Sequence, residues 1–343
     1  MLGEYKVCIL IVTYGNRWHL IEQVLKQVLI FEQVTDIVVV NNASCYNVSE
    51  CTARMGDGRL TVLNNSENLG SAGGYKQGIT YIHKKNEADF YWLLDDDNVP
   101  EENTMSTLLD IWDEIPGNGG KKALFCLRDD RTPHVKIAKG EDYSRYYLIK
   151  DNFMGFSISN SLPNKYYKLQ DMRKDTREYK RYVQIPYVPY GGLLLHKLMI
   201  EVIGLPNTDY FLYADDSEYT YRITQNNGTI WLVPSCKIID VDKSQGFLYK
   251  KKVFHSYLLD QWSFRTYFTV RNLVYFHSCV AIQNKVMFQI NKILFLAYLK
   301  VISILSSRTK QYKKLRSAVD DGLNGRLGKG ASSSWDCNNN IDS

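Results

Sequence analysis

Phe90-Tyr91-Trp92-Leu93-Leu94-Asp95-Asp96-Asp97 is the stretch of sequence that decides the fold. Five apolar or aromatic residues in a row, followed at once by charge, predict a strand buried on both faces of a sheet. In open α/β sheets, ligands bind just beyond the carboxyl ends of such strands. Three adjacent carboxylates repel one another there, and a hard cation such as Mg²⁺ or Mn²⁺ relieves the repulsion. The stretch therefore predicts an α/β sheet with a divalent-metal site, and the alternative is a solvated acidic loop.

Three other apolar runs precede this strand, at residues 6–13, 36–40 and 59–63. Apolar residues at helical spacing lie between the first two runs, which predicts a βαβ unit whose strand ends share one edge. The third run leads into a loop of small residues, 68–74, before a helix predicted to start near Tyr75. Small residues let a backbone approach a ligand closely. The first hundred residues thus predict a nucleotide-binding-like half-sheet.

The pattern loosens over residues 117–185, which we expect to form either irregular strands along an acceptor-side wall or a variable surface insertion. Order returns with a strand predicted over 189–195 and a second acidic cluster, Asp215-Asp216-Ser217-Glu218. A helix is predicted over 219–226, and a short strand over 229–233 that ends at Pro234.

Composition and cysteine usage are those of an ordinary globular protein in a reducing compartment. The chain has 343 residues, of which 45% are hydrophobic and 23% charged, enough for one large α/β domain and an extension. Its seven cysteines are odd in number and scattered, with no metal-ligand spacing, so we expect no disulfide framework. A strand pattern begins within a few residues of Met1, without a basic and then apolar leader. We therefore expect a cytoplasmic protein.

The net charge of +5 belongs to the C-terminal part. Residues 285–343 hold ten Lys or Arg against four Asp or Glu, a net +6, which leaves about −1 for residues 1–284. The apolar segment 286–305 is long enough to cross a membrane. Four of its polar residues, Gln289, Lys292, Lys300 and Ser303, share one narrow helical face.

Such a pattern predicts a helix lying in a membrane interface, and the alternative is a helix packed on the α/β domain or on another subunit. The basic residues that follow add attraction to anionic lipid of about 1 kcal/mol each near the surface.

The two acidic clusters are candidates for two separate roles in breaking a bond to a phosphate. Asp95 and Asp97, assisted by Asp96, are candidates to hold a metal that neutralises a leaving diphosphate. Asp215 or Asp216 is the candidate base that takes the proton from an attacking hydroxyl. Nearby like charges raise the pKa of such a base toward the working range.

The chain resembles the inverting family 2 glycosyltransferases of the GT-A fold, in particular their bacterial galactofuranosyl- and rhamnosyltransferase-like branch. Seven motifs occur in the family's order over most of residues 6–272. They are Val12-Thr13-Tyr14 with Asn16-Arg17, Val40-Asn41-Asn42-Ala43-Ser44, Asn68-Leu69-Gly70-Ser71-Ala72-Gly73-Gly74, Leu94-Asp95-Asp96-Asp97, Tyr190-Gly191-Gly192, Asp215-Asp216-Ser217-Glu218, and Tyr267-Phe268-Thr269-Val270-Arg271-Asn272. The stretch 321–328 is similar to a tail of many membrane-associated members.

The resemblance implies a GT-A domain over residues 1–275, a Rossmann-like mixed sheet flanked by helices, in which 117–185 is the variable acceptor-side insertion. A membrane-associating, amphipathic and basic helical region over 276–328 and a disordered tail over 329–343 would follow it.

The resemblance also implies roles for individual residues. Asp95 and Asp97 would bind Mn²⁺ or Mg²⁺ with Asp96 beside them, and Asp216 would be the catalytic base with Asp215 next to it. Contacts to the donor nucleotide or its sugar are implied for Thr13, Tyr14, Asn42, Asn68 and Gly73. Arg271 would meet a phosphate of the donor or the acceptor.

Two positions depart from the family pattern. Many relatives carry Asp where Asn41 stands, and many carry a metal-binding His six residues after the proline that matches Pro234, where this chain has Asp240. Asp is also a ligand for a hard cation, so Asp240 is the predicted third metal ligand. Asp242 is the alternative, and His255 is a weaker candidate.

The predicted activity is metal-dependent transfer of a hexose from a nucleotide sugar to a lipid-linked or polysaccharide acceptor in cell-surface polysaccharide synthesis. By resemblance, the first choice of donor is UDP-galactofuranose and the second is dTDP-rhamnose. The enzyme would be peripheral on the inner face of the cell membrane. No nucleic-acid partner is expected, and a homo-oligomer is left open.

Two alternatives remain. A haloacid dehalogenase-type phosphatase is one, because residues 95–99 fit its first motif, but its scheme needs Ser or Thr where Arg128 follows the strand 122–127. A non-catalytic sugar-nucleotide-binding subunit is the other.

Overall fold

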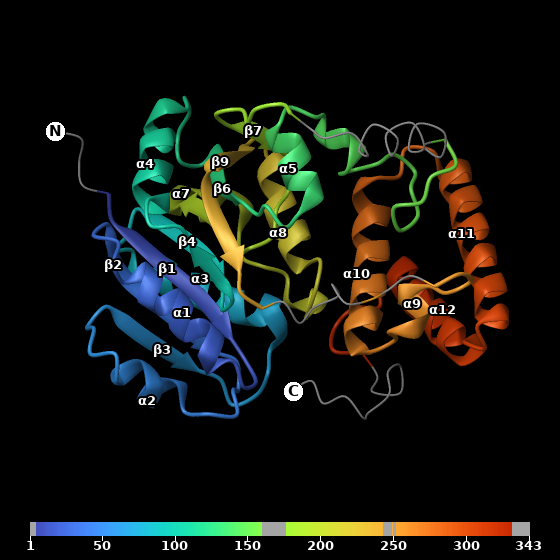
Figure 1. Cartoon of the computed structure of the whole chain (residues 1–343), viewed down its shortest axis with the longest axis horizontal. Coiled ribbons are helices and arrows are strands. Elements are labelled where there is room, and N and C mark those ends of the chain that lie inside the picture. The colour runs from blue at the N-terminus through green and yellow to red at the C-terminus, as the bar shows by residue number, and fades with distance from the viewer. Residues whose placement is uncertain (1–4, 160–175, 243–248, 250–251, 331–343) are drawn as a thin grey trace.

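The computed structural model describes residues 5–159, 176–242, 249 and 252–330. Figure 1 shows an α/β domain with a group of helices from the C-terminal part of the chain beside it. The disordered tail predicted for 329–343 falls, from residue 331 on, outside the described residues.

The N-terminal half of the sheet is parallel, as the apolar runs predict. Strands β1 (Val7–Thr13), β2 (Val34–Asn41), β3 (Leu60–Asn64) and β4 (Phe90–Asp95) lie in the order β3-β2-β1-β4. Trp92 and Leu93 of β4 belong to the hydrophobic cores on opposite faces of the sheet, so this strand is buried on both sides. Val12 pairs with Asp95 and Thr13 with Asn41, which brings the polar strand ends to one edge.

The second half makes the sheet mixed. Strand β8 (Leu193–His196) lies antiparallel between β4 and β6 (Lys122–Leu127), and β9 (Thr229–Asp240) runs parallel to β6. The short strands β5 (Asn98–Pro100) and β7 (Val183–Ile185) pair with β9. Because β6 lies within the sheet, the segment 117–185 is more than a surface insertion.

Strand β9 does not stop at Pro234, as the sequence predicted, but continues to Asp240. The pairing with β6 shifts its register here, from Cys126 opposite Val233 to Leu127 opposite Lys237. An irregularity of this kind accommodates a proline, which has no N–H to donate to the ladder. The continuation places Asp240 opposite Asn98, next to the acidic triplet.

Helices cover both faces of the sheet. Helices α1 (Trp18–Val28) and α4 (Thr104–Glu114) pack on one face, and α3 (Gly70–Lys85), α5 (Thr132–Ala138), α7 (Lys197–Ile203) and α8 (Asp215–Gln225) on the other. The short helix α2 (Val48–Ala53) lies beside β3. Together with the mixed sheet, these layers confirm the predicted α/β fold class.

Helix α3 begins at Gly70 and not near Tyr75, so most of the predicted small-residue loop is helical. The glycines allow this helix to pack closely on β1. A Cβ at Gly74 would lie 2.6 Å from Cγ1 of Val12, and one at Gly78 would lie 2.2 Å from Cδ1 of Leu10. The small residues therefore serve helix–strand packing.

The C-terminal helices form a unit with its own core. It comprises α9 (Tyr257–Asp260), α10 (Phe264–Val280), α11 (Lys285–Leu305) and α12 (Thr309–Leu323). Phe153 and Phe211 of the α/β domain join this core, and the ring of Phe211 lies 5.1 Å from that of Phe268. The helical unit is thus joined to the loop that precedes α8.

Helix α11 (Lys285–Leu305) is packed on the protein along one side and is exposed over most of its residues. It is long and apolar enough to cross a membrane by length and composition, yet 33% of its apolar window is buried inside the protein. The predicted polar stripe is interrupted, because Ser303 is buried and its hydroxyl donates to the carbonyl of Lys300. Gln289 and Lys300 are exposed.

Candidate active site

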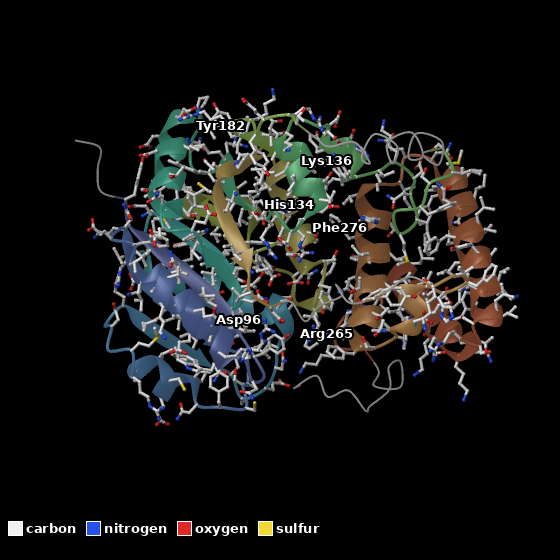
Figure 2. The ribbon with its side chains drawn as sticks, in the orientation of Figure 1. Asp96, His134, Lys136, Tyr182, Arg265 and Phe276 are labelled. Atoms are coloured by element: carbon white, nitrogen blue, oxygen red, sulfur yellow. The ribbon has the colours of Figure 1, made fainter. Side chains whose placement is uncertain are left out.

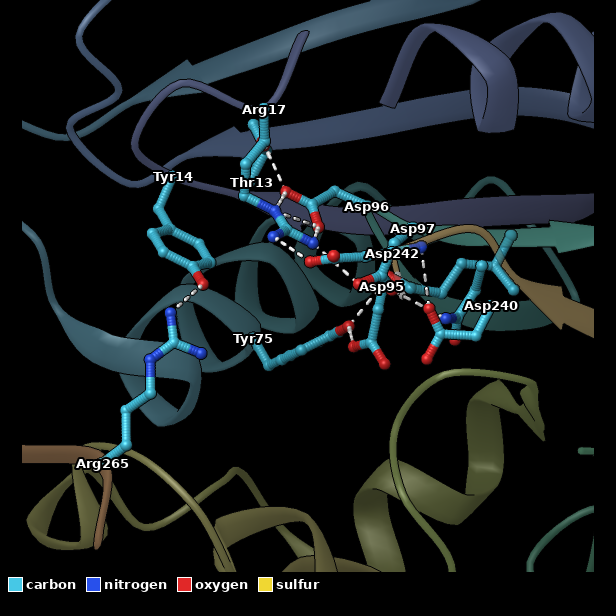
Figure 3. A network of polar contacts seen from close by, with 12 residues as sticks. Thr13, Tyr14, Arg17, Tyr75, Asp95, Asp96, Asp97, Asp240, Asp242 and Arg265 are labelled. Atoms are coloured by element: carbon cyan, nitrogen blue, oxygen red, sulfur yellow. Dashed lines mark hydrogen bonds and ion pairs between the residues drawn. The ribbon is translucent and has the colours of Figure 1, made fainter. Parts of the chain in front are cut away.

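Three consecutive aspartates lie at the carboxyl edge of the parallel strands (Figure 3). Asp95 closes β4 opposite Val12. Asp96 is buried, and the hydroxyl of Thr13 donates a 2.8 Å hydrogen bond to its Oδ2. Burial raises the pKa of Asp96, although the charge of Arg17 opposes the shift. The triplet therefore lies at a strand end, where the sequence placed it.

Arg17, in the loop before α1, is a cation that binds several carboxylates of this cluster. Its Nη2 lies 2.7 Å from Oδ2 of Asp97, its Nη1 lies 2.7 Å from Oδ2 of Asp242, and its Nε donates to Oδ1 of Asp96 at 2.9 Å. The forked guanidinium suits several carboxylates at once. Arg17 thereby ties Asp242, just beyond β9, to the acidic triplet.

Asp95 is fixed by neighbours on the other side. The hydroxyl of Tyr75 lies 2.9 Å from Oδ1 of Asp95, and the Tyr75 ring stacks on that of Tyr190 at 3.9 Å. A Cβ at Gly191 would lie 2.5 Å from Oδ2 of Asp95 and 1.9 Å from Oδ1 of Asn98, so the close approach requires glycine. Burial raises the pKa of Asp95.

Asp97 is half-buried among other negatively charged side chains. Burial, followed by the charges of Asp95, Asp96 and Asp240, raises the pKa of Asp97 to about 8. Groups whose pKa is raised by crowded like charges bind a cation readily once it displaces the proton.

Asp240 and Arg128 complete the cluster. Arg128 follows β6 and is buried, and its Nη2 lies 2.7 Å from Oδ2 of Asp240. The backbone N–H of Asp242 donates to Oδ1 of Asp240 at 3.0 Å. Asp240 is close enough to raise the pKa values of Asp95 and Asp97. His255, the weaker metal candidate, instead pairs with Asp260, with 2.9 Å between Nδ1 and Oδ2.

The cluster has an excess of negative charge. Five carboxylates and two guanidinium groups leave a formal −3 when all are ionised, the groups being Asp95, Asp96, Asp97, Asp240, Asp242, Arg17 and Arg128. Carboxylate oxygens and this charge fit Mn²⁺ or Mg²⁺. In the parts of the chain that the structure describes, however, no three acidic, His or Cys side chains already form a metal-binding group. A metal here would need further oxygen ligands, from water or from a bound molecule.

The second acidic cluster opens α8. Asp215 is buried and accepts a 2.8 Å hydrogen bond from the hydroxyl of Ser71, the second residue of α3. Asp216 is half-buried, and its Oδ1 accepts from the backbone N–H of Ser217 at 2.6 Å and from the Ser217 hydroxyl at 3.2 Å. Acidic residues suit the first turn of a helix because its N-terminus is positive.

The pKa values separate these two carboxyls. Burial, and then the charge of Asp216, raises the pKa of Asp215 well above its ordinary value. Burial is also the largest cause of the raised pKa of Asp216, about 6, and the charge of Asp95 adds to it. Asp216 thus has the more accessible side chain and a pKa close to neutral. These are the properties required of a general base.

A strained loop presents Asp215 and Asp216. Phe211, Tyr213 and Ala214 all have positive φ, at 63°, 65° and 58°, conformations that L-residues rarely adopt. The amide Nδ2 of Asn272, on α10, lies 2.8 Å from each of the carbonyl oxygens of Tyr210, Leu212 and Tyr213. Asn272 therefore clamps the loop in this conformation.

Arg271, which the resemblance assigned to a phosphate, is part of the same clamp. Its side chain is fully buried. The guanidinium donates to Oδ1 of Asn272 at 2.8 Å, to the carbonyl of Tyr210 at 3.1 Å and to the carbonyl of Gly328 at 2.6 Å. Arg271 therefore holds the helical unit to the loop.

The predicted nucleotide-binding residues brace the end of β2 against α3. Asn42 is buried, and its Nδ2 donates to Oδ1 of Asn68 at 3.0 Å and to the carbonyl of Gly70 at 2.9 Å. Gly70 has φ +71°, and a Cβ there would meet the carbonyl oxygen of Phe211 at 2.0 Å. The position of a Cβ on Gly73 instead faces Leu69, at 2.5 Å. Gly70 is therefore the glycine that the loop geometry requires.

Four residues of the site region were given no role by the sequence analysis: Arg17, Tyr75, Arg128 and Arg265. Arg17 and Arg128 each follow a buried strand within a few residues, a signal that was available. Tyr75 and Arg265 lie on helices among other aromatic and basic residues, and only the fold brings them to Asp95 and to Tyr14.

Comparison with known proteins bears on the family and the fold of the chain. Residues 8–161 match the model of glycosyl transferase family 2. The structure is similar to that of GalNAc-T7 with UDP, GalNAc and Mn²⁺, at a TM-score of 0.52 and 13% identity, covering 80% of this chain and 48% of that one. It is also similar to the mannosyltransferase PcManGT from Pyrobaculum calidifontis in complex with GDP-Man and Mn²⁺, at a TM-score of 0.51 and 16% identity, covering 96% of this chain and 77% of that one.

The fold and the family-model match together indicate the class of protein. The α/β domain has the fold of the GT-A glycosyltransferases, and the sequence of its N-terminal part fits family 2, so fold and sequence both support a glycosyltransferase. The chain spans about half the length of GalNAc-T7. No curated protein matches the chain.

Proposed function

We propose that the protein is a metal-dependent inverting glycosyltransferase that moves a hexose from a nucleotide diphosphate sugar to a hydroxyl of a glycan. The observation that carries the proposal is the pairing of two acidic centres. Asp95 and Asp97 lie at the sheet edge, and Asp216, on a separate helix, is close enough to Asp95 for the two charges to interact. Separate carboxylates would thus act on the leaving group and on the nucleophile.

A divalent ion, when bound, would supply positive charge to balance that of the departing diphosphate. Asp95 and Asp97 would hold that ion, and Asp240 lies beside them as the third acidic group. Asp216 would accept the proton of the acceptor hydroxyl as the new bond forms, in a single displacement. Asp215, held by Ser71, and Asn272 would keep Asp216 in position.

Mn²⁺ and a nucleotide or nucleotide sugar are named with both similar structures, UDP in one and GDP-Man in the other. They support Mn²⁺ or Mg²⁺ and a nucleotide diphosphate sugar for this chain. The finer choice of UDP-galactofuranose, with dTDP-rhamnose second, rests on the sequence resemblance.

Two rival functions fit the site less well. A phosphatase of the haloacid dehalogenase type needs a hydroxyl at the end of β6, but Arg128 stands there and binds Asp240. A non-catalytic sugar-nucleotide-binding subunit would not need a half-buried carboxyl with a pKa of about 6 beside the metal ligands.

The proposal is tested by a donor screen. Purified protein with Mn²⁺ is incubated with a panel of nucleotide sugars, with and without glycan acceptors, and release of nucleoside diphosphate is measured. We expect release with one donor and its abolition by EDTA. Turnover of a generic phosphomonoester, and of none of the nucleotide sugars, would favour the phosphatase instead.

The acceptor is proposed to be lipid-linked, or a polysaccharide in cell-surface synthesis, because α11 offers a surface for a membrane. The face of α11 that points away from α10 and α12 is exposed and apolar, and it includes Val286, Ile293, Val301 and Ile304, which are 56 to 69% exposed. An exposed apolar patch on a helix marks a protein or membrane contact. Lys300 flanks the face, and the basic helix α12 follows it, so anionic lipid is the favoured partner.

Replacing two residues of this face tests the membrane proposal. Ile293→Asp with Ile304→Asp should lower the fraction of protein that sediments with phosphatidylglycerol vesicles at least tenfold. Ile30→Asp is the matched control, because Ile30 is 55% exposed but lies in the α/β domain. Undiminished sedimentation of the double variant with vesicles would contradict the proposal. If the wild type is a dimer in solution and the double variant is a monomer, a second copy of the chain is the partner instead.

A further inference from the structure

Arg265 lies in the first turn of α10, where the helical unit borders the site (Figures 2 and 3). Its side chain is half-buried and points toward Tyr14, which directly follows β1. Its Nη2 is 3.3 Å from the phenol oxygen of Tyr14, and its Nη1 is 3.5 Å from that of Tyr213. Two residues far apart in the sequence thus hold one guanidinium at the rim of the site.

The charge of Arg265 is not balanced by an acid. Within the ranges that the structure describes, no carboxylate oxygen lies within 4.0 Å of its guanidinium nitrogens. Arg17 and Arg128 differ in this respect, because each binds carboxylates directly. The two phenol contacts are long and use two of five N–H donors. A half-buried guanidinium of this kind favours an oxyanion, which it binds in a forked manner.

The position of Arg265 indicates which anion it meets. Tyr14 adjoins Thr13, whose hydroxyl binds Asp96, and the Tyr14 ring also lies 5.3 Å from Cζ of Arg17. Tyr213 comes two residues before Asp215. Arg265 is therefore held between the loop after β1, on the donor side, and the loop that presents the proposed base.

We propose that Arg265 binds the diphosphate of the nucleotide sugar and takes up part of its charge as the sugar leaves. The inference rests on the proposed function and adds to it a diphosphate-binding residue from the helical unit. A fixed cation aimed at a group that gains charge stabilises the transition state more than the ground state. The same phosphate chemistry occurs in a lipid-diphosphate acceptor, which the experiment has to distinguish.

The test compares a nucleoside diphosphate with its nucleoside. Wild-type protein with Mn²⁺ is titrated calorimetrically with UDP, dTDP and GDP, and the best ligand and its parent nucleoside are then titrated into Arg265→Gln. We expect affinity for the diphosphate to fall at least tenfold and affinity for the nucleoside to stay within twofold. Arg308→Gln is the control, because Arg308 lies in the same helical unit but pairs with Asp260.

Each outcome decides a different point. If the wild type binds none of the three diphosphates, the proposed function itself is wrong. If it binds one and Arg265→Gln binds it equally well, the assignment of Arg265 is wrong. Unchanged diphosphate binding with transfer reduced at saturating donor would place Arg265 on an acceptor phosphate and overturn the donor assignment. Equal losses for diphosphate and nucleoside would show a structural role, and Arg265→Lys, which keeps the charge, provides the second variant if Arg265→Gln does not fold.

Discussion

The pH dependence of transfer should report the ionisation of Asp216. Its pKa of about 6 is raised first by burial and then by the charge of Asp95. A base works only when ionised, so the rate should be high above the pKa and fall as pH drops through it. With a midpoint near 6, kcat should fall about tenfold between pH 7 and pH 5, whereas an ordinary aspartate would leave it almost unchanged over that range.

A single hydroxyl provides the perturbation that tests this reasoning. The Ser217 hydroxyl donates to Oδ1 of Asp216 at 3.2 Å and stabilises its charged form. Ser217→Ala removes this bond and leaves the backbone N–H bond in place, so the midpoint should rise by roughly 0.5 of a pH unit. The assay is kcat against pH at saturating donor and Mn²⁺. Ser278→Ala, which removes a bond to a carbonyl within α10, should leave the profile unchanged.

A flat profile between pH 7 and pH 5 would refute the assignment of Asp216 as the base. A normal profile that Ser217→Ala does not move would refute the stated contribution of the hydroxyl to its pKa.

Three further predictions concern the groups around Asp216 and the metal. The pKa of Asp97 is raised to about 8, and a protonated carboxyl binds no cation. The affinity for Mn²⁺ without donor should therefore fall about tenfold per pH unit below pH 8. An affinity, measured by calorimetry, that does not change between pH 6 and pH 8 would contradict this. Arg17→Gln removes a guanidinium that three carboxylates share, so the metal-free protein should lose about 2–4 kcal/mol of stability. Mn²⁺ should then raise the melting temperature of the variant more than that of the wild type. Asn272→Ala removes the amide clamp from the loop of positive φ, so kcat should fall at least tenfold with little change in calorimetric diphosphate affinity. A loss of diphosphate affinity as large as the loss of kcat would show that the clamp does more than position the base.

The strands could be predicted because their residues carry the signal locally. The runs that became β1, β2, β4 and β6 are buried on both faces or nearly so, and an unbroken apolar run is the pattern that such strands require. The acidic triplet 95–97 could be predicted as part of the site because it directly follows such a run. The continuation of β9 to Asp240 was missed because Pro234 usually ends a strand, and the register shift that accommodates it depends on the pairing with β6.

The cations of the site could not be assigned from sequence, and Arg271 and Arg265 show why. Both are arginines on α10, six residues apart, and the family motif drew attention to Arg271. The packing of α10 on the loop before α8 buries Arg271 against backbone carbonyls and leaves Arg265 half-exposed beside Tyr14. Which side of a helix faces a site is decided by tertiary contacts, which the residues of the helix alone do not specify.

The division of work between the two acidic centres is tested most directly by a pair of matched variants, Asp97→Asn and Asp216→Asn. For each, nucleoside diphosphate affinity is measured by calorimetry with Mn²⁺, and transfer is measured at saturating donor. Asp97→Asn should weaken Mn²⁺-dependent binding at least tenfold. Asp216→Asn should leave binding within twofold of wild type and lower kcat by about 10²–10⁴-fold, the usual contribution of a general base. Transfer at the wild-type rate by Asp216→Asn, with binding intact, would contradict the central claim.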